Sequence, residues 1–139
     1  MRQVAGERPR PFVLEDTEFW WQAAAEGRLL IQRCGDCGDL RHPPSPSCPR
    51  CRSFAWDAVE SAGRGTVHSF VVSHHPQHPA FSYPLTVVLV DLDEGTRLVA
   101  GFDGSADEVS IGLPVALDWI RDEAGTVLPV FRPAGGGER

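Results

Sequence analysis

Short runs of apolar and β-branched residues, separated by turn residues, repeat along the chain from Gly63 onward. "GTVHSFVVSH" is one such run, and "LTVVLVDLDEGTRLVAGF" holds two that flank a turn signal at residues 93–96. "PVALDWIRDEAGTVLPVF" repeats this design around a turn at residues 122–125, whereas "DGSADEVSIGL" is typical of a polar loop with at most one helical turn. About five strands with few helices favour a small closed barrel over an open sandwich, so we expect a barrel over residues 61–133.

The N-terminal part of the chain has a different pattern. The segment "EFWWQAAAEG" combines helical propensity with Phe19, Trp20 and Ala23 on one face, and Gly27 is a plausible stop. A helix this short is marginal alone, so we expect it to dock on its own domain or on a partner. Residues 1–14 are rich in Pro, Arg and Gly. We predict a flexible arm there, and a disordered tail over the C-terminal residues 134–139.

All four cysteines lie within 18 residues, in the segment "RCGDCGDLRHPPSPSCPRCR", between the strand-like stretches "RLLIQRC" and "SFAWDAVE". They form two C-x2-C pairs, Cys34 with Cys37 and Cys48 with Cys51, separated by ten residues. Each C-x2-C turn aims both sulfur atoms at one point, and two facing turns offer the thiolate tetrahedron that zinc accepts. We therefore predict that residues 15–60 form a unit of helix and metal-bound ribbon with a structural zinc ion.

Other uses of the cysteines stay open at this point. Iron in the same thiolate cage, disulfides or a thioredoxin-type couple would each use C-x2-C pairs. The ten-residue connection is shorter than in the common zinc-site template, but zinc is favoured over iron because the sequence shows no second redox centre or flavin motif. His42 lies between the pairs and could replace a cysteine as a ligand, but four cysteines already suffice, so we expect a surface histidine. Four thiolates close the coordination shell, so we assign no catalytic chemistry to the metal.

Charge is distributed unevenly along the 139 residues, whose net charge is −6 and whose 13 basic residues are all arginine. Residues 28–56 hold five arginines against two acids, and residues 57–139 hold five against twelve. The basic segment is either a solvated surface or a site for an anion such as a phosphorylated cofactor. Acidic residues 91, 93 and 94 lie at a hairpin turn, where we expect solvated carboxylates.

Nothing in the apolar pattern indicates secretion or membrane insertion. The longest apolar run, "LTVVLV", is strand-sized and far shorter than the ~20 residues needed to cross a bilayer. The N-terminal "MRQVAGERPRPF" lacks an apolar signal-peptide core. We therefore expect a cytoplasmic protein, in a compartment where thiols stay reduced.

The order of these motifs resembles a known family. The segments "FWWQAAAEGRLLIQRC", "CGDC…CPRC", "GRGTVHSFVVSHHPQHPAF", "VVLVDLDEGTRLVAGF", "IGLPVALDW" and "LPVFRPA" follow one another as in the acyl-CoA-associated family known as domain of unknown function thirty-five. The resemblance covers roughly residues 14–133. It implies a mainly β protein with an N-terminal helix, a rubredoxin-like zinc ribbon and a five-stranded OB-fold barrel.

The resemblance also implies a function. Members of this family act as non-catalytic accessory subunits that bind thiolase-superfamily enzymes and help them hold or pass CoA thioesters. One branch resembles the partner domain of steroid side-chain retro-aldolases, which cleave a β-hydroxyacyl-CoA. The resemblance therefore implies a hetero-oligomer with a thiolase-like enzyme, a CoA thioester at or near the interface, and an enoyl-CoA hydratase-like protein as a further partner or fusion.

Several side chains are candidates for contact with such a partner or with CoA. The Trp pair suits an interface or packing within the protein, the arginines suit CoA phosphates or surface salt bridges, and the Pro-stiffened histidine loop suits a contact or a merely exposed loop. The candidates are Trp20, Trp21, Arg33, Arg50, His74, His75, His78 and Phe81.

Two other functions remain as alternatives. The first is a self-sufficient acyl-CoA-binding enzyme that uses the histidine loop as its base. The second is a single-stranded nucleic-acid binder, a common role of OB-folds. The acidic C-terminal half would repel a phosphate backbone, so we expect no nucleic-acid partner.

Overall fold

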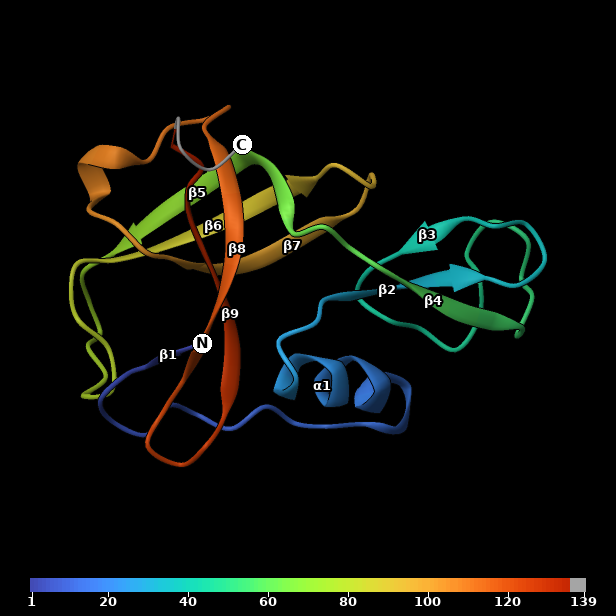
Figure 1. Cartoon of the computed structure of the whole chain (residues 1–139), viewed down its shortest axis with the longest axis horizontal. Helices are drawn as coiled ribbons and strands as arrows, with labels where there is room; N and C mark the ends of the chain where they lie inside the picture. Colours follow the sequence, from blue (N-terminus) through green and yellow to red (C-terminus); the bar gives the residue numbers. More distant parts are fainter. Residues whose placement is uncertain (136–139) are drawn as a thin grey trace.

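The computed structural model describes residues 1–135 and contains two β-sheets, one α-helix and two 3-10 turns (Figure 1). The helical elements are η1 (Glu15–Thr17), α1 (Glu18–Ala25) and η2 (Ala106–Glu108). The strands are β1 (Arg2–Gln3), β2 (Leu30–Cys34), β3 (Leu40–Arg41), β4 (Trp56–Glu60), β5 (Arg64–Ser73), β6 (Leu85–Leu92), β7 (Arg97–Phe102), β8 (Pro114–Arg121) and β9 (Val127–Pro133). The mainly β fold predicted from the sequence is confirmed.

Five strands close into a barrel. The order is β8-β5-β6-β7-β9, and pairing of β8 with β9 joins the two ends. Every neighbouring pair is antiparallel except β7 and β9, which run parallel from Gly101↔Val130 onward. Closure is partial at two seams, because β5 pairs with β8 only over residues 64–66 and β7 pairs with β9 only over residues 101–102. The predicted hairpin turn between β6 and β7 and the one between β8 and β9 both form.

Alternation of apolar residues builds the barrel core. Along β6, every second residue is buried, so Val88 and Val90 point inward. Phe131 from β9 is fully buried in the same core. The core continues beyond the barrel, because Trp20 of α1 and Ile31 of β2 belong to the same apolar cluster. The helix therefore docks on its own chain and links the barrel to the ribbon.

The ribbon is a three-stranded antiparallel sheet of order β3-β2-β4, beside the barrel and next to α1 (Figure 1). A short linker connects β4 to the barrel. Glu94 holds this linker, because its carboxylate accepts hydrogen bonds from the Ser61 hydroxyl at 2.8 Å and from the Ala62 amide at 2.9 Å. The expectation of a merely solvated turn acid is therefore wrong for Glu94.

The N-terminal arm lies against the barrel. Strand β1 pairs in parallel with β8, with Arg2 opposite Ile120. Farther along, the Arg8 amide donates to the Asp122 carboxylate at 2.9 Å, and the Gly6 amide donates to Glu123 at 2.6 Å. These contacts could not be predicted from the sequence, because a two-residue strand has no apolar period.

At the C-terminal end, the Ala134 amide donates to the Pro114 carbonyl at 2.9 Å. Most of the tail predicted to be disordered, residues 136–139, lies outside the described residues. Within residues 1–135, no helix has the length and apolar character needed to span a bilayer.

Candidate metal centre and an apolar pocket

The two C-x2-C pairs form matching turns. The Cys34 amide donates to the Asp39 carbonyl and the Cys48 amide to the Ser53 carbonyl, both at 2.9 Å. Each turn closes on the residue after its second cysteine. The Gly38 amide reaches the Cys34 carbonyl at 3.1 Å, and the Arg52 amide reaches the Cys48 carbonyl at 2.8 Å. Both closing residues have a left-handed backbone, with φ of +77° at Gly38 and 66° at Arg52.

The four sulfur atoms converge, as the spacing predicted. All four lie within 4.8 Å of one another, with 3.4 Å between the Cys34 and Cys51 Sγ atoms and 3.7 Å between those of Cys37 and Cys48. These separations are too long for a disulfide. They fit a tetrahedron around zinc, because Zn–S bonds of about 2.3 Å place neighbouring sulfurs about 3.8 Å apart. The residues therefore fit a tetrathiolate zinc ion, with no fifth protein ligand required.

Backbone amides favour the thiolate form of one cysteine in each pair, Cys34 and Cys48. The amides of Cys37 and Asp36 both point at the Cys34 sulfur, each at 3.4 Å. These donors lower the pKa of Cys34 to about 6. In the second turn, the Cys51 amide likewise lowers the pKa of Cys48. Because a metal binds the thiolate form, these amides favour coordination at neutral pH.

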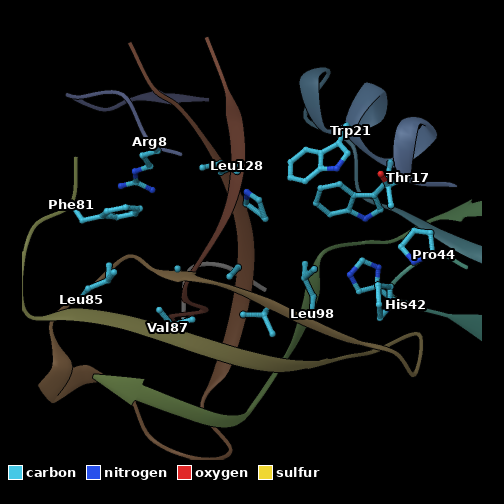
Figure 2. Close-up of a pocket in the computed structure, with 16 residues that line it drawn as sticks. Arg8, Thr17, Trp21, His42, Pro44, Phe81, Leu85, Val87, Leu98 and Leu128 are labelled. Carbon is cyan, nitrogen blue, oxygen red and sulfur yellow. The ribbon is translucent and has the colours of Figure 1, made fainter. Parts of the chain in front are cut away.

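A second feature lies where the barrel, α1 and the ribbon meet. It is an apolar pocket of about 500 Å³ (Figure 2). The N-terminal arm, the loop before β6, the loop after β3, and strands β6, β7 and β9 all contribute walls. These walls are formed mainly by Trp20, Trp21, Pro43, Pro44, Phe81, Leu85, Val87, Leu98, Val99, Leu128 and Pro129. Ligand pockets commonly form at such junctions between structural units.

The pocket has two different ends. At one end, Arg8 lies over the Phe81 ring, with 4.5 Å from the guanidinium carbon to the ring centroid. Figure 2 shows Trp21 and His42 at the other end. There the Trp20 ring lies 4.7 Å from that of Trp21 and 5.9 Å from His42. Burial lowers the pKa of His42, so the imidazole is neutral at pH 7. His42 is half-buried in this wall, which corrects the expectation of a surface histidine.

The predicted contact residues fall into three groups. Trp20, Trp21 and Phe81 line the pocket together. His74, His75 and His78 are exposed in the loop between β5 and β6, where the Ala80 amide donates to His78 Nδ1 at 3.0 Å. Arg33 and Arg50 lie on the ribbon surface, away from the pocket: Arg33 makes a two-pronged contact with Asp57 at 2.7 and 2.8 Å, and Arg50 lies 3.9 Å from Asp39.

The sequence did not predict Arg8 and His42 as pocket residues. Arg8 lies in a segment with no periodic pattern, and His42 was considered only as a metal ligand. The single local signal was composition, because each of these residues lies in a Pro-rich stretch that is stiff enough to form a wall.

Comparison with known proteins identifies both structural units. Residues 21–57 match the family model described as the rubredoxin-like zinc ribbon domain of ChsH2, and residues 58–119 match its C-terminal OB-fold domain. The chain is 56% identical over 128 residues to the "Probable enoyl-CoA hydratase alpha subunit" of Thermomonospora curvata. It is 42% identical over 112 residues to the "3-oxo-4,17-pregnadiene-20-carboxyl-CoA hydratase alpha subunit" of Mycobacterium tuberculosis. These matches include 91% and 80% of the chain, but only 40% and 36% of the two relatives.

A smaller relative and a solved structure match over more of their own length. A "DUF35 domain-containing scaffold protein" of Methanocaldococcus jannaschii is 29% identical over 99 residues, which is 68% of the chain and 70% of that protein. The solved structure described as "Ltp2-ChsH2(DUF35) aldolase" includes a chain that is 54% identical, with a TM-score of 0.87, covering 91% of this chain and 100% of that one. The chain therefore belongs to the ChsH2, or DUF35, family, in which a rubredoxin-like zinc ribbon is joined to an OB-fold domain.

Proposed function

We propose that this chain is a non-catalytic accessory subunit that binds a thiolase-superfamily CoA enzyme and supports its folding or its handling of CoA thioesters. The reaction, a retro-aldol cleavage of a steroid β-hydroxyacyl-CoA, takes place in the partner. The zinc ion has a structural role in this proposal. It fixes the ribbon as a stiff docking edge, so that little further ordering is needed on association.

The observation that carries this proposal is the relationship to the aldolase structure. A chain 54% identical over 91% of this sequence occurs in a structure described as an Ltp2-ChsH2 aldolase. The four-cysteine site also supports an accessory role, because four thiolates leave no open position for a substrate. The scaffold name of the archaeal relative has the same implication.

The two hydratase relatives support the finer parts of the proposal. Their names describe alpha subunits of acyl-CoA hydratases, and the chain spans about two fifths of their length. We therefore propose an enoyl-CoA hydratase-like unit as a further partner or fused neighbour. The name of the mycobacterial relative specifies a 3-oxo steroid acyl group. A 3-oxo steroid attached to CoA is accordingly the acyl group that we propose for the complex.

Co-purification tests this function. The zinc-loaded chain, expressed with the Ltp2 subunit of the related aldolase, should elute with it as one species, whose mass is measured by light scattering. Cys48→Ser should abolish the complex together with the bound zinc, because Cys48 is a buried ligand of the ribbon. Ser47→Ala is the matched control next to it and should preserve both. Separate elution of the intact, zinc-loaded chain and Ltp2 would refute the proposal.

A further inference from the structure

The apolar pocket described above contains buried donors that lack an acceptor. Arg8 Nε and Trp20 Nε1 are both inaccessible to solvent and have no hydrogen-bond partner within the described part of the chain. Buried polar groups are normally paired, because leaving a donor unmatched costs free energy. Both residues line the pocket. The two donors lie at opposite ends of the pocket, so an occupant with one oxygen atom beside Arg8 would offer an acceptor to that guanidinium and leave the Trp20 donor unpaired.

Charge decides which part of a CoA thioester the pocket suits. Among the sixteen described residues that line it, Arg8 is the only one with a formal charge at pH 7. The nucleotide end of CoA carries several phosphate charges and needs more cationic groups than one. An uncharged acyl group instead buries hydrocarbon against the valine, leucine and aromatic walls, which stabilises it by about 25 cal/mol per Å². The pocket therefore suits the acyl end.

The arrangement of the walls indicates the shape of the occupant. Figure 2 shows Arg8 and Phe81 at one end, Trp21 and His42 at the other, and aliphatic side chains such as Val87 between them. Flat aromatic faces and a pocket within the usual range for small-molecule sites, about 300–1,000 Å³, favour a rigid ring system over a flexible chain. The guanidinium at one end favours a carbonyl oxygen there.

We propose that this pocket binds the ring system of a polycyclic ketone, with the ring carbonyl oxygen accepting a hydrogen bond from Arg8 and the hydrocarbon rings lying between α1 and β6–β7. The inference rests on the proposed function, since the ketone is the 3-oxo steroid part of the acyl group handled by the complex. It adds a role that an accessory subunit does not require, because this chain itself would hold the end of the substrate farthest from the CoA thioester.

Paired ligands and paired variants test this site in the zinc-loaded full chain. Isothermal titration compares androst-4-en-3-one with androst-4-ene, which lacks only the ketone oxygen. We expect the ketone to bind the unmodified chain at least tenfold more tightly, since a hydrogen bond from a charged donor is lost with the hydrocarbon. Arg8→Met retains an unbranched side chain of similar length but has no hydrogen-bond donor. It should remove most of the preference for the ketone.

Obstruction of the pocket provides the second arm of the test. Val99 lines the pocket and is 60% exposed, whereas Ile111, in the loop before β8, is not among the lining residues and is 73% exposed. Val99→Trp should weaken binding of both ligands at least tenfold, and Ile111→Trp should leave both unchanged. Because both positions are exposed, neither substitution disturbs the core, and circular dichroism checks that each variant is folded.

Some outcomes would overturn the inference while leaving the proposed function intact. Absence of steroid binding by the chain, both alone and in its complex with Ltp2, would show that the pocket is not a ligand site. Equal affinity for both ligands would remove the role of Arg8. Loss of the Ltp2 complex in Val99→Trp without any steroid binding would show that the pocket receives a partner side chain. Failure of the chain to bind Ltp2 at all, by contrast, would refute the proposed function whatever the steroid result.

Discussion

The ribbon and the barrel are each stabilised by a different kind of interaction. The barrel encloses side chains such as Val67, Val88 and Phe131, all buried and apolar. Beyond Ile31, the buried residues of the ribbon are cysteines and the polar pair Gln32 and Arg41. The side chains of Gln32 and Arg41 both donate hydrogen bonds to the backbone carbonyl of Ser45. One unit is therefore stabilised by apolar burial and the other by sulfur ligands and a few hydrogen bonds.

This difference predicts that the two units respond to different perturbations. Burial of apolar area in the barrel is spread over five strands, so each side chain contributes a fraction of the total. The ribbon depends on one centre, and an ion bound only by the folded form stabilises that form directly. Removing the ion should therefore affect the ribbon alone, whereas cutting a side chain out of the barrel should affect the whole chain.

Loss of the metal centre is the largest effect that we expect. Cys34→Ser, or a strong chelator, should remove a contribution on the order of 10 kcal/mol from the folding of the ribbon. Amide hydrogen exchange should then lose protection in β2 and β3 but keep it in β6 and β7. Ser47→Ala serves as the matched control and should keep the amides of all four strands protected. Continued protection of β2 in the zinc-free chain would mean that apolar packing holds the ribbon.

Truncation in the barrel core comes next. Phe131 is 0% exposed, so Phe131→Ala should lower the free energy of unfolding by about 3–5 kcal/mol through lost burial and a residual cavity. Urea denaturation measures this change. Ile111→Ala provides the control, because Ile111 is 73% exposed and its removal should matter by less than about 0.5 kcal/mol. A core substitution that left the midpoint unchanged would contradict the assignment of stability to apolar burial.

The same contrast determines what the sequence could predict. The convergence of the four cysteines was predictable because they lie within one short stretch, where the spacing of the pairs largely determines the geometry. The barrel strands were identified because alternation is also local, as in β6. In the ribbon, the short strand β3 was not predicted, and the bounds of β4 differed. Strand β4 begins at Trp56, whereas the apolar stretch suggested a start at Ser53.

The pocket could not be predicted in this way. Arg8 and Leu128 lie near opposite ends of the chain and meet only because the barrel closes and the arm pairs with β8. No local pattern encodes such an encounter. Trp20 and Trp21 were singled out as contact candidates, but whether they faced a partner or their own chain depended on how α1 docks. The structure places both in the wall of the pocket.

A third kind of contact, hydrogen bonds from backbone amides to the Asp122 carboxylate, joins the N-terminal arm to the barrel and should depend on pH. Burial alone would raise the pKa of Asp122, but amide donors from Arg8, Thr126 and Ala124 outweigh it and hold that pKa below its usual value. A carboxyl with a lowered folded pKa stabilises the fold fully above its unfolded pKa of about 3.9, and this stabilisation is lost as the pH falls through the folded value.

Asp122→Asn should therefore lower the thermal midpoint at pH 6, by less than Phe131→Ala does. The gap in thermal midpoint between this variant and the unmodified chain should narrow as the pH approaches 3. Thermal unfolding followed by circular dichroism at several pH values measures this gap. Asp107→Asn removes an exposed acid from η2 and should produce no such gap. A gap that stayed constant with pH would show that shape, not charge, explains the role of Asp122.

The smallest effect that we expect on stability comes from substitutions in the two turns of the metal site. Gly38 and Arg52 close equivalent turns in the same left-handed conformation, which costs a residue with a side chain about 1–2 kcal/mol. Arg52→Gly relieves this strain but makes the unfolded chain more flexible, so the net gain should be about 0.5–1 kcal/mol. Gly38→Ala should lower the stability of the ribbon by about 1 kcal/mol, although open space surrounds its Cβ position.

Arg50→Gly removes the same charge from the same turn without relieving strain, and it should destabilise the ribbon. Hydrogen exchange of the Cys34 and Cys48 amides reports these changes locally. If Arg52→Gly and Arg50→Gly shifted exchange in the same direction, charge rather than backbone conformation would distinguish the second turn from the first.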